Sequence, residues 1–206
     1  MVLEYMNKAT LADVLKKVKV IPEHILGIIS NQILKGLEYL QKEKLVVHRD
    51  IKPSNILLNS NGYAKISDFG ISKILEDSKD ILKTLIGTYI YMSPERIRGQ
   101  NYGFNSDVWS VTMAILECAT GQHPYIQMNG FGNVNDLWSL LYLIDSNSSP
   151  YLPADYFSPE FCDFIQVSLN KDPGLRPNAE KLLSHPFVMK YENQHSVLAA
   201  WLSQIK

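Results

Sequence analysis

The sequence has little of several features that would assign it to a well-defined class of protein. It has only two cysteines, Cys118 and Cys162, which lie far apart and lack the spacing of metal ligands. We therefore expect free thiols in a reducing cytosol, not a disulfide framework. No apolar run is long enough to cross a bilayer, and the first residues lack the basic segment and apolar core of a signal peptide. The expected location is cytoplasmic.

An excess of charge of one sign is also lacking. The chain has 20 basic and 21 acidic residues, for a formal net charge of −1. This balance gives no reason to expect general binding to nucleic acid or to an anionic membrane. No internal repeat or low-complexity block is visible. A chain of 206 residues can bury one sizeable core, so a single domain or lobe over 1–206 is the simplest organisation.

What the sequence does contain is an ordered series of polar motifs. The stretch His48-Arg49-Asp50-Ile51-Lys52-Pro53-Ser54-Asn55 is followed by Asp68-Phe69-Gly70 and then by Ser93-Pro94-Glu95. The same order of an H-R-D-L-x-x-x-N loop, D-F-G and A-P-E is the signature of protein phosphoryl transfer. A single His-Arg-Asp would mean little, but agreement in residue type, order and spacing makes coincidence a poor explanation.

The chemistry of such a site explains the residue types. Catalysis is mostly positioning and neutralisation of charge: one carboxylate receives the proton of the substrate hydroxyl, while an Asn and a second Asp hold magnesium against the phosphates. The order of the motifs assigns Asp50 to the proton, and Asn55 and Asp68 to the metal. The predicted cofactors are therefore ATP and Mg²⁺.

Apolar periodicity predicts a mainly α fold, a helical bundle with a small β-hairpin layer at the catalytic loop. We expect helices over 11–18 (with Thr10 as N-cap), from Pro22 to near Lys44, over 107–119 (with a Ser106 cap), 136–144, 159–169, 179–183 and 195–205. Short strands are expected at 2–6, 45–47, 56–58 and 63–66. Residues 68–95 and 122–135 are expected to be loops, with one helical turn after Pro94. The helix over 107–119 is apolar all round, so it should be the buried centre of the lobe.

Essentially the whole chain resembles the hinge and C-terminal lobe of a eukaryotic protein kinase, and within that superfamily a mitogen-activated protein (MAP) kinase kinase. The resemblance rests on Gly87-Thr88-Tyr89-Ile90-Tyr91-Met92-Ser93-Pro94-Glu95-Arg96-Ile97, Asp107-Val108-Trp109-Ser110, Lys171-Asp172-Pro173 with Arg176, and His185-Pro186-Phe187. It implies a dual-specificity enzyme that phosphorylates Thr and Tyr on a MAP kinase and is activated by an upstream MAP kinase kinase kinase. Ser78 and Thr84 match the two activating phosphorylation sites, with a separation similar to that of plant members.

The resemblance also implies a nucleotide site. Glu4 and Met6 would be the hinge residues that bond adenine, and Leu57 would form the floor of the adenine pocket. Ser54 would be a further nucleotide contact, and Lys52 would neutralise the transferred phosphoryl group.

Supporting roles are implied for residues around the catalytic loop. His48 would support the loop, and Arg49 would contact a phosphorylated activation loop. Thr88 would help to shape the substrate platform. Glu95 would pair with Arg176, and Asp107 would bond the catalytic-loop backbone from the central helix.

The sequence departs from the family pattern at two places. Asn7-Lys8-Ala9 replaces the usual Asp-Gly-Gly after the hinge, which puts a ribose contact at Asn7 in doubt. Thr112 replaces the Gly normally found after the Trp-Ser pair, which should crowd that helix slightly.

The family's Gly-rich loop, its phosphate-binding Lys and the Glu partner of that Lys precede the hinge, where this sequence begins. We therefore expect the N-terminal β lobe to be absent from these 206 residues and the chain alone to be inactive. Two functions remain open: the catalytic lobe of a dual-specificity kinase, or a non-catalytic stand-alone lobe that docks partners or competes with an intact kinase. Retention of Asp50, Asn55 and Asp68 favours the first.

Overall fold

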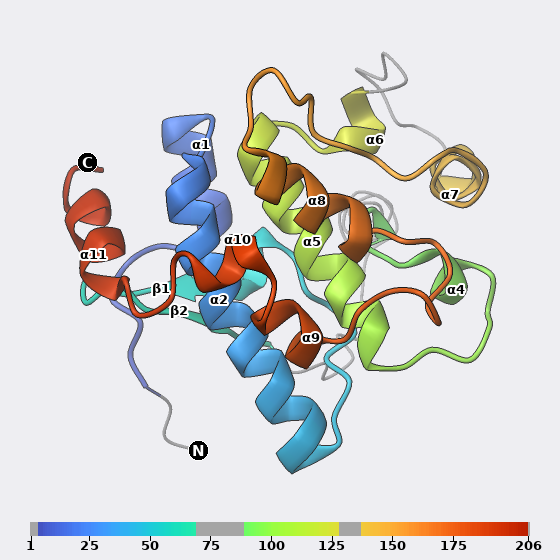
Figure 1. The fold of residues 1–206 in the computed structure, drawn as a ribbon, viewed down its shortest axis with the longest axis horizontal. Coiled ribbons are helices and arrows are strands. Elements are labelled where there is room, and N and C mark those ends of the chain that lie inside the picture. The colour runs from blue at the N-terminus through green and yellow to red at the C-terminus, as the bar shows by residue number, and fades with distance from the viewer. Residues whose placement is uncertain (1–3, 69–88, 128–136, 206) are drawn as a thin grey trace, which may run out of the picture.

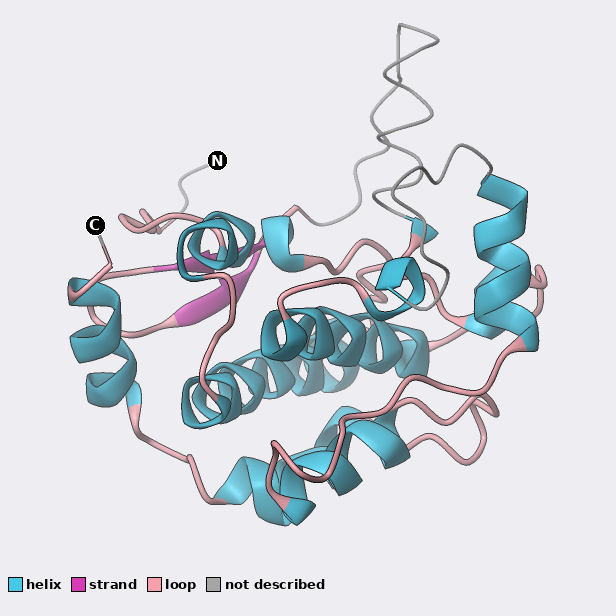
Figure 2. Ribbon diagram, turned by 90° about the horizontal axis from the view of Figure 1, so that it is seen from above, coloured by secondary structure: helices cyan, strands magenta, loops and turns pink. Residues whose placement is uncertain are grey.

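The computed structural model describes residues 4–68, 89–127 and 137–205 (Figure 1). Within these residues the chain is mainly helical and has one two-stranded sheet, as expected. At the centre, α2 (Glu23–Tyr39) packs against α5 (Phe104–Thr120). α9 (Ala179–Leu183) and α10 (Pro186–Met189) pack on α2, and α8 (Pro159–Ser168) packs on α5. Figure 2 shows the sheet on the opposite side of α2 from these three short helices.

The first helix, α1 (Leu11–Val18), begins at the predicted N-cap. The Thr10 hydroxyl accepts the backbone N–H of Asp13, and the Asp13 carboxylate accepts the backbone N–H of Thr10 in return. This reciprocal capping box satisfies two N–H groups that have no partner inside the helix. α2 then follows Pro22, and its last turn continues as a short π-helix, η1 (Leu40–Lys44).

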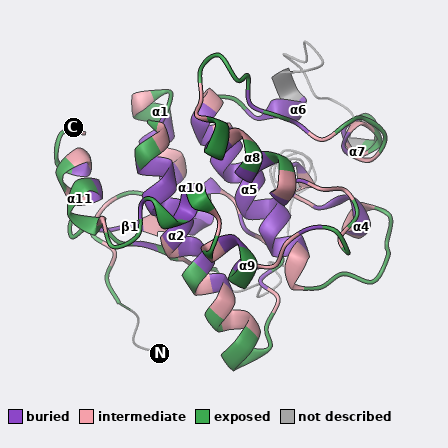
Figure 3. Cartoon of the chain, in the orientation of Figure 1, coloured by how far each residue is buried: buried purple, intermediate pink, exposed green. Residues whose placement is uncertain are grey.

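Helix α5 is the buried centre of the molecule, as its sequence predicted. Every side chain from Ser106 to Leu116 is buried (Figure 3), including that of Trp109, which is fully enclosed. The helix ends at Gly121, which has a φ of 80°. A Cβ there would lie 2.5 Å from the Lys19 carbonyl oxygen, so both the left-handed conformation and the close approach require glycine.

Two details of α5 differ from the sequence expectations or extend them. The helix begins at Phe104, so Ser106 lies in its first turn and is not the N-cap; its hydroxyl instead donates to Glu95. The Thr112 hydroxyl donates to the Val108 carbonyl oxygen one turn earlier, at 2.8 Å. The helix backbone thus satisfies the buried hydroxyl that stands where the family has glycine.

The sheet is a hairpin of β1 (Ile56–Leu58) and β2 (Ala64–Ile66), paired antiparallel with Ile56 opposite Ile66. In the turn, the Asn59 side-chain oxygen accepts the N–H groups of Asn61 and Tyr63, each at 3.0 Å. Gly62 has a φ of 78°, and a Cβ there would meet the backbone of α11 (His195–Ser203). The turn is therefore fixed by its own Asn and by the last helix.

Two strands expected near the start of the chain are not present among the described residues. Glu4–Met6 is irregular, and residues 1–3 lie outside the described part. Leu45 ends η1 in a left-handed conformation (φ 54°) and is 77% exposed. The segment 45–47 has no strand partner in the described structure, and apolar content alone does not make a strand without a partner.

The remaining elements are short helices. They are η2 (Pro53–Asn55, a 3₁₀ turn), α4 (Pro94–Ile97), α6 (Pro124–Gln127) and α7 (Leu137–Ser146). α4 is the helical turn expected after Pro94, and α6 interrupts the loop expected over 122–135, of which residues 128–135 lie outside the described part. No helix among the described residues is both long enough and apolar enough to cross a membrane.

Candidate active site

The backbone of the catalytic loop is held by one buried carboxylate at the start of α5. Asp107 Oδ2 accepts the N–H of His48 at 2.7 Å, and Asp107 Oδ1 accepts the N–H of Arg49 at 2.9 Å. Asp107 is only 2% exposed. Burial raises the pKa of this carboxyl, and the two N–H groups, with a smaller contribution from the charge of Arg96, offset part of that effect. The contact expected between Asp107 and the catalytic-loop backbone is thus present.

His48 joins the catalytic loop to the segment before Asp68. Its Nε2 lies 2.9 Å from the Ser67 carbonyl oxygen, and because a carbonyl only accepts, we assign the proton to Nε2. Nδ1 then accepts the N–H of Asp50, at a longer 3.4 Å. The Ser67 N–H donates to the Asn55 carbonyl oxygen at 2.9 Å. These bonds bring the two predicted metal-binding segments together.

Asp50, Lys52 and Asn55 form the chemical centre of the loop. Asp50 Oδ2 lies 3.0 Å from Lys52 Nζ and accepts a hydrogen bond from Asn55 Nδ2 at 3.0 Å. The Asp50 and Lys52 side chains are 32% and 20% exposed. The carboxylate is therefore oriented from one side and open to solvent on the other, as a group that receives a proton from an incoming hydroxyl requires.

The donor set at Asn55 and Asp68 fits magnesium. Asn55 Nδ2 donates to both the side chain and the carbonyl oxygen of Asp50, and within the described structure Asn55 Oδ1 has no hydrogen-bond partner. Asp68 is exposed and has a left-handed φ of 60°. Amide and carboxylate oxygens are ligands that Mg²⁺ accepts, and it commonly takes few protein ligands alongside phosphates. The described residues contain no cluster of three or more His, Cys, Asp or Glu that could hold a metal by itself.

The segment expected to be the hinge lies along the hairpin. The Lys8 N–H donates to the Leu58 carbonyl oxygen at 3.1 Å, and Thr10 forms an isolated antiparallel bridge with Leu57. Glu4 pairs with Lys65, the residue opposite Leu57 in the hairpin. Because opposite residues of an antiparallel pair share a face, Glu4 and Leu57 lie on the same side. Met6, between them in the chain, is half-buried.

Asn7 is committed to the hairpin turn. Its Nδ2 donates to the Ser60 hydroxyl at 2.9 Å, and its Oδ1 accepts the Ser60 N–H at 2.8 Å. The Asn7 amide is thus used to hold the hairpin turn, a role that the amide NH₂ group allows and that the carboxylate of the family's Asp would lack.

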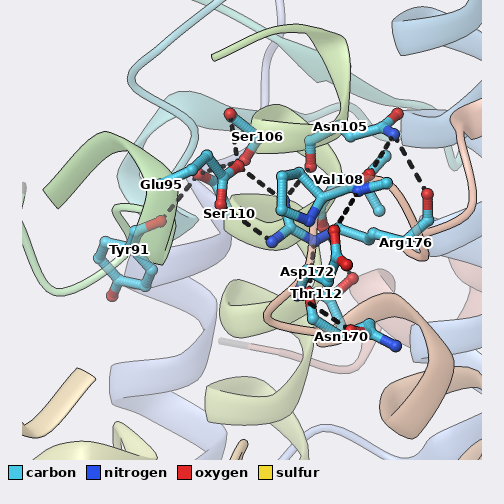
Figure 4. Close-up of polar contacts among 12 residues, drawn as sticks. Tyr91, Glu95, Asn105, Ser106, Val108, Ser110, Thr112, Asn170, Asp172 and Arg176 are labelled. Carbon is cyan, nitrogen blue, oxygen red and sulfur yellow. Dashed lines mark hydrogen bonds and ion pairs between the residues drawn. The ribbon is translucent and has the colours of Figure 1, made fainter. Parts of the chain in front are cut away.

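A buried ion pair joins Glu95 of α4 to Arg176 (Figure 4). Arg176 donates from Nη1 and Nη2 to the two Glu95 oxygens at 2.8 and 3.0 Å, and both side chains are essentially unexposed. The Ser106 hydroxyl donates to the same Glu95 carboxylate, and Arg176 lies over the Trp109 ring with 5.1 Å to its centroid. Burial by itself raises the pKa of Glu95, but the bonds and charge of Arg176 with the bond from Ser106 outweigh it and lower the pKa to about 2.

Of the other predicted residues, two lie in the described part of the chain and five lie outside it. Ser54 is exposed within η2, and the Arg49 guanidinium lies over the Tyr102 ring with 5.4 Å to its centroid. The two predicted phosphorylation sites and the substrate-platform residue lie outside the described residues, as do two residues of the second motif. They are Ser78, Thr84, Thr88, Phe69 and Gly70.

One contact to the catalytic loop was not predicted. Arg96 Nη1 donates to the Arg49 carbonyl oxygen at 2.6 Å. The sequence contained a signal for it. Glu95 was expected to point toward Arg176, and because successive residues of a helix point in different directions, Arg96 has to point elsewhere. Only the folded chain shows that this direction leads to the catalytic loop.

The described structure also has an apolar groove away from these residues. It has a volume of about 440 Å³ and lies between α2, the hairpin and the segment that leads into α11. Its lining includes Ile33, Tyr39, Tyr63, Ile66 and Tyr191, and none of the predicted site residues. The candidate active site is thus defined by its polar geometry and not by this groove.

Comparison with known proteins agrees with the motifs. The protein kinase domain profile matches residues 1–188. The chain is 48% identical over 203 residues to mitogen-activated protein kinase kinase 3 of Arabidopsis thaliana, covering 98% of this chain and 38% of that protein. It is 47% identical to mitogen-activated protein kinase kinase SIPKK of Nicotiana tabacum (93% of this chain, 54% of that protein). It is 38% identical to dual specificity mitogen-activated protein kinase kinase dSOR1 of Drosophila melanogaster (97% and 55%). The chain thus spans about half the length, or less, of these relatives.

Proposed function

Because the chain belongs to the protein kinase family and resembles MAP kinase kinases over nearly its whole length, we propose that it forms the large lobe of an enzyme that transfers the γ-phosphoryl group of ATP to a MAP kinase. The observation that carries the proposal is the orientation of Asp50 by Lys52 and Asn55, each 3.0 Å from the same carboxylate oxygen. A docking module that performs no chemistry has no need of this arrangement.

Each residue of the centre has a task in that reaction. Asp50 orients the substrate hydroxyl and takes up its proton as the hydroxyl oxygen attacks the γ-phosphorus, while the bond from that phosphorus to the bridging oxygen breaks and ADP leaves. Lys52, beside it, places a positive charge where the transferred phosphoryl group would pass. Asn55 holds Asp50 through its amide N–H groups and offers its oxygen, with the Asp68 carboxylate, to magnesium. The bound metal supplies positive charge to the phosphates.

Substrates and regulation belong to the same proposal. We propose phosphorylation of both Thr and Tyr on a MAP kinase, and activation by an upstream MAP kinase kinase kinase at Ser78 and Thr84. A phosphate there supplies strong acceptors for the Arg49 guanidinium. A cytoplasmic location is proposed on the ground that Cys118 and Cys162 are both free thiols.

These 206 residues by themselves are proposed to be a poor catalyst. They carry no Gly-rich loop ahead of the site and no lysine matching the one that anchors the phosphates. Loss of one preorganised electrostatic group typically costs about 100- to 1000-fold in rate, and here several are lacking together. Adenine would meet only the Glu4–Met6 segment and Leu57.

The test uses the chain in two forms. One is the chain alone; the other is an extended protein, in which the residues of the tobacco relative that lie ahead of its match precede Met1. After both forms have been treated with a MAP kinase kinase kinase, phosphate transfer to a MAP kinase is measured with radiolabelled ATP, and mass spectrometry assigns the acceptor residues. We expect transfer to Thr and Tyr by the extended protein only.

Two variants and a control decide the residue roles. In the extended protein, Asp50→Asn and Asp68→Ala should abolish transfer, while Asp155→Asn, a change at an exposed carboxylate, should leave it unaltered. Near wild-type turnover by Asp50→Asn would overturn the catalytic proposal. Inactivity of the unsubstituted extended protein would favour the non-catalytic alternative.

A further inference from the structure

Arg96 contacts the backbone next to the proposed proton acceptor. The Arg49 carbonyl oxygen, which accepts from Arg96 Nη1 at 2.6 Å, belongs to the peptide group that joins Arg49 to Asp50. A hydrogen bond from a charged donor is stronger than one between neutral groups. Arg96 therefore acts directly on the orientation of the peptide that leads into Asp50.

That peptide needs to be held. Arg49 has a φ of 74°, a left-handed conformation that is unfavourable for a residue with a Cβ. Its N–H is accepted by Asp107 and its C=O receives Arg96. Within the described residues, the N–H of Asp50, on the other side of the same peptide group, has only the long 3.4 Å contact to His48. Arg96 thus makes the strongest contact that the described structure provides to this peptide group.

The surroundings of Arg96 favour this use of its side chain. Its guanidinium lies over the Tyr102 ring, 5.4 Å from the centroid, and Arg49 lies over the same ring at the same distance. In the part of the chain that the structure describes, Arg96 has no carboxylate within ion-pair distance, although the charges of Asp107 and Asp50 are close enough to attract it. A backbone carbonyl is therefore its principal polar partner.

We propose that Arg96 is a positioning residue for phosphoryl transfer, which holds the Arg49–Asp50 peptide in the left-handed turn that presents the Asp50 carboxylate beside Lys52 and Asn55. The adjacent Glu95 fixes α4 to the buried Arg176. The position of α4 therefore sets the position of Arg96, which bonds the catalytic loop. The catalytic part of this inference rests on the proposed function; the hold on the loop backbone does not.

Hydrogen exchange in the 206-residue chain tests the hold on the loop. In Arg96→Met we expect the amides of His48 and Arg49 to exchange about tenfold faster or more, since local opening is easier, while amides in the middle of α5 keep their rates. Arg98→Met is the matched control, because Arg98 lies two residues from Arg96 and pairs with Asp145, not with the catalytic loop. Arg96→Lys, which keeps a charged donor, should restore part of the protection. Rates equal to those of the control, or acceleration throughout α5, would overturn the proposal.

Steady-state kinetics of the extended protein test the catalytic consequence. In Arg96→Met we expect kcat to fall about 10- to 100-fold, as for a misplaced catalytic group, while KM for ATP changes less than about twofold. Arg96→Lys should recover part of kcat, and Arg98→Met should match the unsubstituted protein. An unchanged kcat in Arg96→Met would refute the positioning role. If the unsubstituted extended protein transfers no phosphate, the proposed function fails, and the exchange measurement still decides whether Arg96 holds the loop.

Discussion

The Glu95–Arg176 junction and the catalytic loop each place a carboxylate beside a cation, and they differ in their access to water. Glu95 and Arg176 are 1% and 0% exposed, and the Arg176 guanidinium also donates to two backbone carbonyl oxygens, those of Asn170 and Asn105. Asp50 and Lys52 are 32% and 20% exposed, and one face of the carboxylate is open. Buried charges must be fully paired to be tolerated, whereas a carboxylate that is to meet a substrate must stay accessible from solvent. The first pair is enclosed in the fold, and the second can be reached from solvent.

The two buried carboxylates of these regions show the same contrast. Glu95 has a buried cation as its direct partner, which lowers its pKa to about 2 against the effect of burial. Among the described residues, Asp107 accepts hydrogen bonds only from backbone N–H groups, and burial prevails and raises its pKa. A buried carboxylate that serves the catalytic loop thus costs stability at neutral pH, and one that serves the junction contributes it.

The largest effect that distinguishes the regions is expected on breaking the junction. Arg176→Met removes the cation and leaves Glu95 charged and buried, which should lower the free energy of unfolding by about 3–5 kcal/mol. The control Arg98→Met breaks the exposed pair with Asp145 and should cost at most about 1 kcal/mol. Urea titration followed by circular dichroism measures both. Equal losses in the two variants would remove the distinction between the regions.

Acid should weaken the junction selectively. The pKa of Glu95 lies below its ordinary value of 4.5, so its contribution to stability is present above about pH 4.5 and is lost as the pH falls toward 2. The difference in unfolding free energy between the unsubstituted chain and Glu95→Gln should therefore narrow by about 2 kcal/mol between pH 5 and pH 2.5. Asp107 acts in the opposite sense. Because its pKa is raised, its contribution to the free energy of unfolding is largest at low pH and is lost as the pH rises. A pH-independent difference for Glu95→Gln would contradict the assigned direction.

A smaller loss is expected on the catalytic-loop side of the core. Asp107→Asn keeps one acceptor oxygen but turns an NH₂ group toward a backbone N–H, so one of the two bonds to His48 and Arg49 is lost. The unfolding free energy should fall by about 1–3 kcal/mol, the cost of one unsatisfied buried group. Relief of the burial penalty on the charge acts against this loss. Thermal melts with hydrogen exchange at residues 48–50 measure the change. A loss of unfolding free energy as large as that of Arg176→Met would show that Asp107 supports the fold as strongly as the Glu95–Arg176 pair does.

The smallest effect on stability is expected at the chemical centre itself. Asp50→Asn alters a partly exposed pair with Lys52, and such pairs contribute at most about 1 kcal/mol. The melting curve should therefore be nearly unchanged, although the same substitution is proposed to abolish transfer in the extended protein. A strongly destabilised Asp50→Asn would show that this carboxylate supports the fold and would weaken its assignment to chemistry.

Local sequence signals predicted most of the helices because their causes are local. Thr10 and Asp13 cap each other across a few residues, and the apolar run after Asp107 can be satisfied only by burial on all sides. The hairpin was predictable for the same reason, since Asn59 and Gly62 build the turn themselves. Residues 45–47 failed as a strand because a strand also needs a partner, which the local sequence does not supply.

The motifs by themselves determined which residues belong to the candidate site, because the chemistry of phosphoryl transfer demands an Asp, an Asn and a second Asp in a fixed order. Only the tertiary structure decided what holds them. The bond from Arg96 to the Arg49 carbonyl, the use of Asn7 by the Ser60 turn and the bond from Ser106 to Glu95 join residues distant in the sequence. The first and third of these bonds depend on the packing of α4 with the catalytic loop and α5, and the second depends on the packing of the segment before α1 against the hairpin. A donor and an acceptor bond only where folding has brought them within about 3 Å of each other.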